Sequence, residues 1–593
     1  MLRYILISLL LISCGFANAD KIIKVPSVKG DATSVLRKVI NEAATYKGEK
    51  VIIELPEDTL HFSRINSSEH LYHISNTTSQ KENPNATKHI GVWLKKLDNI
   101  TIEGNGCLIL THGEMTPFVI DSCKNIELRN FRLDAADPSV VEIDITDKNE
   151  DYISFYVLPP TNFEFNGDSF SFVGEGWQFG DNQRNSNHVE YAQIYYPEDG
   201  RTLRKVSPMK NYTKAGLIGD RLIRMDFEKN KVPSVSVGER YQLRHGIRNE
   251  VCMFINRSEG IKLSDIVFNF MGNFGIVGQF SENLTYERIK CQPLEGSGRT
   301  NTGFADFLQF SSCRGLLRII DSIFEGSQDD PINIHGTHLQ IEQIIDSKQI
   351  IIGYKHPQTY GFLPCEPGDE LMVVNRKTLN DVGEPIKVAK IDIIDDYRYC
   401  VSFQKDLPVE VDFNNPMAYV VENISWIPEV IIKGNSFKST PTRAILITTR
   451  SNSLIEGNKF YNIPMASILV ADDARSWYES GPVKQLTIRN NTFYNCNGPV
   501  IAITPEVETC EKPVHENINI ENNRFIMPGL PVIKIYDSAN IKIEDNLLEL
   551  SSKYYCEPQK ALSFDEMIEL NNVTNSIIHD NHIKQSDIGS LNQ

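Results

Sequence analysis

The chain has 593 residues, 41% of them hydrophobic, and a formal net charge of −17 at pH 7. Nucleic-acid binding needs a concentrated basic surface, so this composition argues against a nucleic-acid partner. An acidic surface is equally unfavourable for gripping polyuronates, which leaves a neutral sugar as the easier carbohydrate substrate. The length would allow three or four ordinary domains, but a repeat architecture can exceed ordinary domain size because each repeat packs only on its neighbours.

Residues 1–19 are predicted to be an export signal. An apolar stretch from Tyr4 to Ile12 precedes Ala17-Asn18-Ala19, a small-x-small cleavage site. The segment Leu11 to Cys14 also fits a bacterial lipobox, in which Cys14 becomes the lipidated N-terminus. The apolar stretch is too short to span a membrane. The protein is therefore expected to be exported, either as a soluble periplasmic protein or as an outer-membrane lipoprotein attached only through Cys14.

Residues 20–140 are predicted to form an N-terminal cap and the first coils of a solenoid. An amphipathic helix followed by a strand occupies about 35–62, and such a helix commonly covers the open end of a β-helix. From about residue 92, segments of the form N-x-x-I-x-x-N-x-F recur, as in NITIEGN from Asn99 and NIELRNF from Asn125. Short strands with strict inward and outward alternation and Asn or Gly at the turns predict a right-handed parallel β-helix of the all-β class.

Two segments interrupt this repeat. Residues 141–248 and 339–424 contain longer strands and charged hairpins, and each is predicted to be a small β-barrel insertion at a solenoid turn. The coils are expected to resume over 249–338 and again over 425–593. The insertions have either a purely structural role or supply one wall of an active-site cleft, since insertions in repeat proteins gather on the binding face.

The coils at 249–338 carry the most informative residues, the doublet Asp329-Asp330 and a third acid, Asp306. When Ile332 is aligned with Leu308, Asp306 falls in register with Asp330, 24 residues later. Adjacent coils stack about 4.8 Å apart, so three carboxyl groups should crowd one edge of the solenoid. Like charges at this spacing raise at least one pKa, and a protonated acid beside an ionised one suits hydrolysis of a glycosidic bond. The alternative is that the doublet is only a solvated turn.

Polar residues beside the acids are candidates for substrate binding. Asn333 and Gln309 project outward from consecutive coils, where they either bind sugar hydroxyls or form an amide ladder that stabilises the stack. His335 has the same outward parity and suits a sugar hydroxyl or a partner for a carboxylate. His335 and His338 together are an alternative pair of metal ligands, but no metal site is predicted.

Two residues farther along the chain complete the candidate site. Arg443 aligns with Asp330 on the coil that follows the second insertion. It is expected to depress a carboxylate pKa, to fork onto two hydroxyls, or to form only a structural ion pair. A polar loop, ADDARSWYESGP, breaks the coil pattern after Val470 and carries Trp477, which is either a sugar-stacking rim residue or a residue packed on the solenoid.

The cysteines do not indicate a metal or a cofactor. Ten cysteines besides Cys14 are scattered without C-x-x-C spacing, which argues against zinc. In coil strands cysteine serves as a small hydrophobe. Export would permit disulfides, and Cys496 with Cys510 is the nearest plausible pair.

The order of signal, capped β-helix and two insertions resembles glycoside hydrolase family 110. The segments ADFLQF, EGSQDDPINIHGTH, TRAILITTR and SWYESGP carry the resemblance, which covers nearly all of the mature chain. It implies an α-1,3-galactosidase that removes terminal galactose from blood-group-B-type glycans, with inversion and without a metal. It also implies Asp329 as the acid, and Asp330 and Asp306 as candidate bases. Whether linear Galα1-3Gal is also a substrate stays open.

The chemistry of the residues agrees with this resemblance. Asp329 would donate a proton to the leaving oxygen, while Asp330, or Asp306, would draw a proton from water on the opposite face of the ring. Arg443 favours ionisation of Asp330, so Asp330 is our preferred base. Two alternatives remain: a polygalacturonase-like β-helix hydrolase, and a non-catalytic glycan-binding adhesin. A galactose-terminated glycan is the expected partner, and the oligomeric state is not predicted.

Overall fold

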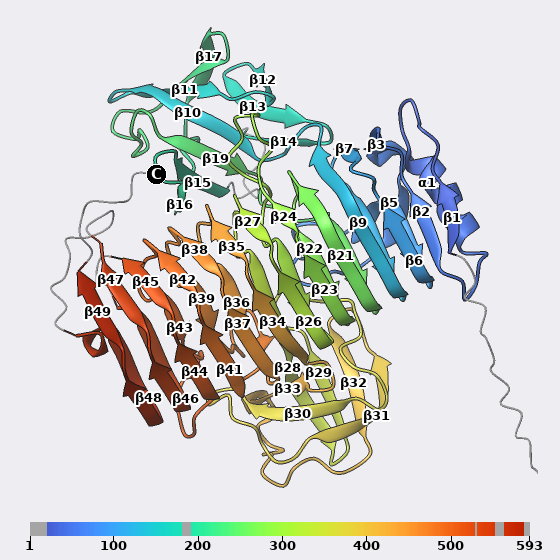
Figure 1. The fold of residues 1–593 in the computed structure, drawn as a ribbon, viewed down its shortest axis with the longest axis vertical. Helices are drawn as coiled ribbons and strands as arrows, with labels where there is room; N and C mark the ends of the chain where they lie inside the picture. Colours follow the sequence, from blue (N-terminus) through green and yellow to red (C-terminus); the bar gives the residue numbers. More distant parts are fainter. Residues whose placement is uncertain (1–19, 181–190, 528–530, 552–562, 586–593) are drawn as a thin grey trace, which may run out of the picture.

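The computed structural model describes residues 20–180, 191–527, 531–551 and 563–585. The predicted export signal at 1–19 lies outside the described residues, as do Cys14 and Cys556. Figure 1 shows a long stack of parallel strands with two separate groups of strands attached to it. The predicted parallel β-helix is confirmed.

The coils present three faces, each a sheet of parallel strands. The first face runs along the whole stack in this order: β1 (Lys21–Lys24), β2 (Val51–Glu54), β6 (Asp98–Glu103), β9 (Lys124–Ala135), β21 (Glu259–Phe268), β23 (Glu282–Glu287), β26 (Arg314–Ile320), β34 (Pro428–Lys433), β37 (Asn452–Glu456), β41 (Gln485–Arg489), β44 (His515–Glu521), β46 (Ile533–Glu544) and β48 (Ile568–His579).

The second face is made of shorter strands that follow the first after a tight turn. This face starts with β3 (Thr59–Ser63) and β7 (Leu108–His112) and then passes through the C-terminal ends of β9 and β21. It continues with β24 (Lys290–Cys291), β27 (Ile323–Glu325), β35 (Ser436–Lys438), β38 (Lys459–Tyr461), β42 (Thr492–Tyr494), β45 (Arg524–Met527), β47 (Leu547–Leu550) and β49 (His582–Gln585).

The third face positions the site described below. It begins with β4 (Ser68–Leu71), which is antiparallel to its neighbour, and continues through β5 (Thr87–Lys95), β8 (Thr116–Asp121), β20 (Met253–Asn256), β22 (Ile276–Gln279), β25 (Leu308–Ser311), β28 (Ile332–Asp346), β36 (Ile445–Ile447), β39 (Ile468–Val470), β43 (Ile501–Ile503) and the first residues of β46 and β48.

The repeat places identical residues above one another inside the coils. Buried asparagines at the turn between the first two faces donate their side-chain amides to the next asparagine at 2.9–3.1 Å, from Asn435 through Asn581. Phe437, Phe460 and Phe493 stack with ring centroids 4.7–5.0 Å apart. Because these C-terminal coils satisfy their turn amides and fill their core in the same way, this part of the stack extends with one register.

The N-terminal end is covered by α1 (Thr33–Ala43). Its apolar stripe, which includes Leu36, Val39 and Ile40, is buried in the same core as the first coils. Without this helix the first coil would expose its apolar interior to water.

The first insertion is not the closed barrel that the sequence predicts, because it packs two antiparallel sheets around its own core. Seven strands pair in the open order β16-β15-β19-β10-β11-β18-β17, and three more form β12-β13-β14. Phenylalanines of the smaller sheet share one core with the larger sheet. The smaller sheet therefore covers the apolar face that the larger sheet would expose because it is not closed into a barrel. The strands are β10 (Val141–Lys148), β11 (Tyr152–Val157), β12 (Asn162–Asn166), β13 (Ser169–Gly174), β14 (Trp177–Phe179), β15 (Tyr191–Tyr196), β16 (Arg201–Lys205), β17 (Lys214–Gly219), β18 (Leu222–Asp226) and β19 (Arg240–Arg244).

The second insertion is a closed six-stranded barrel. Its pairings run β28–β29–β32–β31–β30–β33 and return to β28. One continuous strand, β28, begins in the coil and ends in the barrel, so the boundary expected at 338/339 falls inside a strand. The barrel is therefore joined rigidly to the coil that carries the candidate acids. Its other strands are β29 (Gln349–Gly353), β30 (Glu370–Asn375), β31 (Ile386–Ile393), β32 (Arg398–Phe403) and β33 (Tyr419–Asn423).

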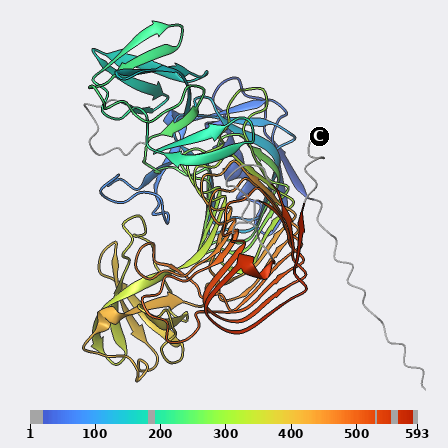
Figure 2. The same cartoon turned by 90° about the vertical axis from the view of Figure 1, so that its left-hand side faces the viewer.

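Figure 2 shows both insertions extending from the same side of the coil stack. In the part of the chain that the structure describes, no helix has the length and apolar character to cross a bilayer.

Candidate active site

A pocket with an empty volume of about 810 Å³ lies on the outer side of the third face. Its floor comes from β28, β36 and β39, and its walls come from the N-terminal segment, the link after the first insertion, and the loop between β39 and β41. The lining residues are Asn76, Arg248, Asp306, Asp329, Asp330, Asn333, Arg443, Leu446, Thr448, Leu469, Ala471, Asp473, Ser476, Trp477, Glu479 and Glu506. All three predicted catalytic acids are among them.

The register of the coils brings the acids together. Leu308 pairs with Ile332, and Ile332 pairs with Ile445, so Asp306 and Asp330 align two residues before their strands, as Arg443 does on the next coil. The proline that follows Asp330 favours an extended backbone at that residue and keeps it from continuing as a helical turn. The side chains of one column therefore meet in the pocket.

Asp330 is held by Arg443. The guanidinium donates from Nε to both carboxylate oxygens at 3.0 and 3.2 Å and from Nη2 at 2.6 Å, and the backbone N–H of Arg443 adds a bond of 3.1 Å. Asp330 is only 2% exposed. Burial raises the pKa of its carboxyl and Arg443 opposes that rise. Arg443 is thus engaged in an ion pair with the candidate base.

Asp306 is the acid most favoured to hold a proton. It is 6% exposed, and burial, followed by the charges of Asp329 and Asp330, raises the pKa of its carboxyl well above the ordinary value. From the sequence, this protonation is predicted at Asp329 instead. The proton is favoured on Asp306 because this residue is more deeply buried than Asp329.

Asp329 lies nearer to solvent and contacts the first insertion. Its side chain is 23% exposed, and its Oδ1 lies 2.9 Å from Nη2 of Arg204, on β16. The first insertion therefore contacts a candidate catalytic carboxyl directly. This agrees with the second of the two expected roles, in which an insertion supplies a wall of the active-site cleft.

Of the polar residues predicted to bind substrate, Asn333 lines the pocket whereas Gln309 and His335 do not. Nδ1 of His335 lies 2.7 Å from the carbonyl oxygen of Gly336, which requires the proton on Nδ1. Nε2 is then free to accept from the Gln309 amide at 3.3 Å. Both side chains are buried, and β40 (Glu479–Ser480) docks on β28 directly after His335.

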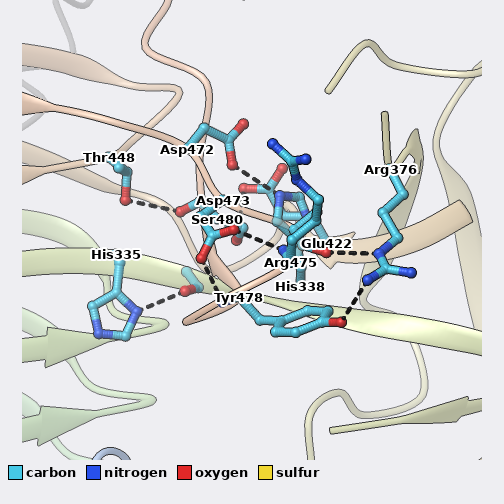
Figure 3. Close-up of polar contacts among 12 residues, drawn as sticks. His335, His338, Arg376, Glu422, Thr448, Asp472, Asp473, Arg475, Tyr478 and Ser480 are labelled. Carbon is cyan, nitrogen blue, oxygen red and sulfur yellow. Dashed lines mark hydrogen bonds and ion pairs between the residues drawn. The ribbon is translucent and has the colours of Figure 1, made fainter. Parts of the chain in front are cut away.

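The loop that carries Trp477 is tightly fastened. Asp473 accepts hydrogen bonds from the backbone N–H groups of residues 475–478. Asp472 pairs with His338 at 2.9 Å, and the Tyr478 hydroxyl accepts from Arg376 at 3.2 Å (Figure 3). Burial alone would lower the pKa of His338, but the carboxyl of Asp472 overrides it and raises that pKa. The buried His338–Asp472 pair thus anchors the loop.

Trp477 lies at the rim of the pocket and is 44% exposed. Its ring stacks on His356 of the second insertion, with centroids 4.3 Å apart. Burial lowers the pKa of His356 to about 4, so the imidazole is neutral at ordinary pH. One face of the indole is supported by the barrel, while the exposed part remains available at the opening.

Several lining residues could not be recognised from the repeat pattern of the sequence. Asn76 precedes the regular coils, Arg248 lies in the link after the first insertion, and Glu479 and Glu506 follow breaks in the repeat. None of them belongs to the coil column that identified the acids. A signal existed only for Glu479, which lies two residues after Trp477 in the loop already singled out.

The described residues contain no group of three or more His, Cys, Asp or Glu side chains arranged to hold a metal. Cys496 and Cys510, the pair considered for a disulfide, are both free thiols.

Comparison with known proteins places the chain in a family. The description "Right handed beta helix region" matches residues 420–591 and confirms the predicted handedness, and "GLAA-B beta-barrel domain II" matches residues 349–414. Alpha-1,3-galactosidase A of Bacteroides thetaiotaomicron is 38% identical over 94% of this chain and 95% of its own length. Alpha-1,3-galactosidase B of the same organism is 28% identical over 93% of this chain and 90% of its own length.

Among solved structures, the surface adhesin PfbA of Streptococcus pneumoniae is similar with a TM-score of 0.37 and 10% identity, over 95% of this chain and 99% of that one. The relatives define a glycoside hydrolase built on a β-helix. The chain belongs to glycoside hydrolase family 110, the family of the alpha-1,3-galactosidases that it matches.

Proposed function

We propose that this protein is an exo-acting α-1,3-galactosidase that removes terminal galactose from glycans with inversion of configuration. Asp306, Asp329 and Asp330 in one pocket are the observation that carries the proposal. Their mutual repulsion and burial favour a proton and an ionised carboxylate within the same cluster. The α-1,3 linkage and the galactose are inferred from the names of the relatives, which are alpha-1,3-galactosidases.

The roles of the acids follow from their positions. Asp329, the most exposed of the three, donates its own proton to the leaving oxygen and becomes ionised. Asp330, paired with Arg443, takes a proton from the attacking water. Asp306 stays protonated beside them, because burial and the two neighbouring aspartates raise its pKa well above the ordinary value. Water and acid on opposite faces of the sugar lead to inversion.

The shape and charge of the pocket favour a terminal neutral sugar. Segments from well-separated parts of the chain surround it, which suits the end of a glycan better than its middle. Six carboxyl side chains and two guanidinium groups line it, an arrangement that repels a uronate. This disfavours the polygalacturonase-like alternative. An adhesin for a neutral sugar has no need of three repelling acids.

The test is release of galactose from a panel containing a blood-group-B trisaccharide, linear Galα1-3Gal and polygalacturonate, with the product anomer followed by NMR. We expect β-galactose to appear first from the branched trisaccharide. If the specificity also includes linear Galα1-3Gal, β-galactose should appear first from that substrate too. Initial α-galactose would refute inversion. Release of galacturonate, or of no sugar, would refute the proposed substrate class.

We also propose that the protein is exported, through the signal at residues 1–19. Mass spectrometry of the mature N-terminus distinguishes cleavage after Ala19 from lipidation of Cys14. A mature protein that begins at Met1 would contradict both forms of the proposal.

A further inference from the structure

Glu479 brings a further carboxyl group into the pocket beside the three acids of the coils. It belongs to β40, which pairs antiparallel with β28 so that Glu479 lies opposite Thr337 and Ser480 opposite Gly336. The side chain is 11% exposed and lines the same pocket as Asp306. A carboxylate in this place either has a structural role or contacts the ligand.

The hydrogen bonds of Glu479 use only one of its oxygens. Oε1 accepts from the side-chain amide of Asn76 at 3.0 Å and lies 3.4 Å from that of Asn333. Among the described residues, none donates a hydrogen bond to Oε2. An ionised carboxylate has lone pairs on both oxygens and accepts hydrogen bonds only. A ligand hydroxyl is therefore the natural donor for the second oxygen.

Asn333 ties this carboxylate to the catalytic cluster. Its amide nitrogen lies 3.4 Å from Oδ2 of Asp306 and 3.4 Å from Oε1 of Glu479. The two carboxyl groups thus face each other across one amide, separated by at most twice that distance. A sugar close enough to react at the acids lies within reach of Glu479.

The supports of Glu479 come from segments far apart in sequence. Asn76 is oriented by Thr359 of the second insertion, whose hydroxyl donates to the Asn76 side-chain oxygen at 2.8 Å. The N-terminal segment and the barrel therefore hold one end of the carboxylate, while β28 holds the loop beneath it. Such support from several elements is typical of a residue whose position has to be precise to within about 0.5 Å.

We propose that Glu479 is a further substrate-binding residue, whose free carboxylate oxygen accepts a hydrogen bond from a hydroxyl of the sugar that is cleaved off. The inference rests on the proposed galactosidase function and deepens it. Hydrogen bonds from hydroxyls to a carboxylate are about twice as strong as neutral ones, so this contact contributes to sugar selection. The charge of Glu479 also adds to the repulsion that keeps Asp306 protonated, after burial and the other two aspartates.

The experiment compares Glu479→Gln with the wild type on aryl α-galactosides. The amide keeps the volume and one accepting oxygen but loses the charge. We expect kcat/KM to fall about 10–100-fold, in keeping with the loss of a hydrogen bond to a charged group. Glu508→Gln is the matched control, because Glu508 lies on the same side of the fold in ion pairs with Arg475 and Lys377 outside the pocket. It should retain wild-type activity.

A second set of substrates separates binding from a structural role. Each galactoside lacks one ring hydroxyl, and the loss caused by Glu479→Gln is measured on each. For the hydroxyl that Glu479 binds, the variant should cost no more than about twofold, since that contact is already gone. An equal loss on every deoxygenated substrate would make Glu479 structural and overturn the inference. So would wild-type kinetics in the variant.

The wild type decides whether the underlying function or the inference has failed. If it releases no galactose from any α-1,3-galactoside, the proposed function is wrong and the inference falls with it. If it is active while the variant behaves as a structural substitution, only the inference is wrong. Thermal unfolding of the variant excludes misfolding as the cause of a loss.

Discussion

Gly336 and Ser480 face each other where the loop after β39 docks on β28, and they leave no room for a side chain on the glycine. A Cβ on Gly336 would lie 2.5 Å from Oγ of Ser480. The backbone of Gly336 is not in the left-handed region, and the other nearby atoms, the Ser480 carbonyl oxygen at 3.4 Å and Oε1 of Glu422 at 3.6 Å, are at ordinary contact distance, so Oγ of Ser480 is the one atom that an alanine would clash with. The close approach sets the position of Glu479, the residue before Ser480, in the pocket.

Gly336→Ala should therefore shift the loop and lower kcat/KM by about 10–100-fold, because a displacement of about 1 Å in a site has effects of this size. Ser480→Ala removes the atom in conflict, so the double variant should recover most of the activity. Ser480→Ala alone is the control. Kinetics of the three variants on one aryl galactoside check this. Failure of the double variant to recover would show that the approach of these two residues does not position the site.

Asp329→Asn should affect substrates in proportion to the proton that their leaving group requires. With a sugar leaving group we expect a loss of about 10²–10⁴ in rate, and a much smaller one with a dinitrophenyl galactoside, whose departing oxygen needs little protonation. Parallel assays on the two substrates measure the ratio. Equal losses would remove Asp329 from the acid role, and near-normal activity would remove it from catalysis.

Asp330→Asn and Asp306→Asn test which carboxylate activates water. Each should lower the rate on an activated galactoside by about 10²–10⁴, with Asp330 the larger loss. Azide should restore turnover in Asp330→Asn and form β-galactosyl azide. Because this variant leaves the Arg443 guanidinium without its partner, its melting temperature is measured alongside. Rescue confined to Asp306→Asn would reverse the assignment.

The raised pKa of Asp306 predicts a stability effect with a definite sign. In the unfolded chain an aspartate has a pKa near 3.9, so above that pH the folded state binds more protons than the unfolded state. The free energy of unfolding therefore falls as pH rises from about 4 toward the folded pKa. Asp306→Asn has no such titration. Its melting temperature relative to wild type should rise from pH 4 to pH 7, on the order of 1–3 °C for a chain of this size. Calorimetry at both pH values checks this. A melting-temperature difference between variant and wild type that stays constant or falls with pH would show that the pKa of Asp306 is not raised.

The β-helix and the column of acids were predictable because both depend on local repetition. Strands of alternating parity, with asparagine at the turns, predict the coil, and the alignment of Ile332 with Leu308 then places Asp306 beside Asp330. The alignment of Arg443 with Asp330 was likewise correct, and the structure realises it as an ion pair. The position of Trp477 at the rim was one of two options that the sequence left open. The export signal remains a prediction.

What the sequence by itself determined is the solenoid and which side chains share a column on it, because stacking repeats a single register from one coil to the next. Only the tertiary structure decided what surrounds that column. Arg204 and Glu479 reach the acids from an insertion and from a docked loop, and β40 buries His335 instead of leaving it to face a ligand. These contacts join segments with no common period. Their positions depend on packing between elements that are far apart in the chain, and no pattern within the repeat encodes that packing.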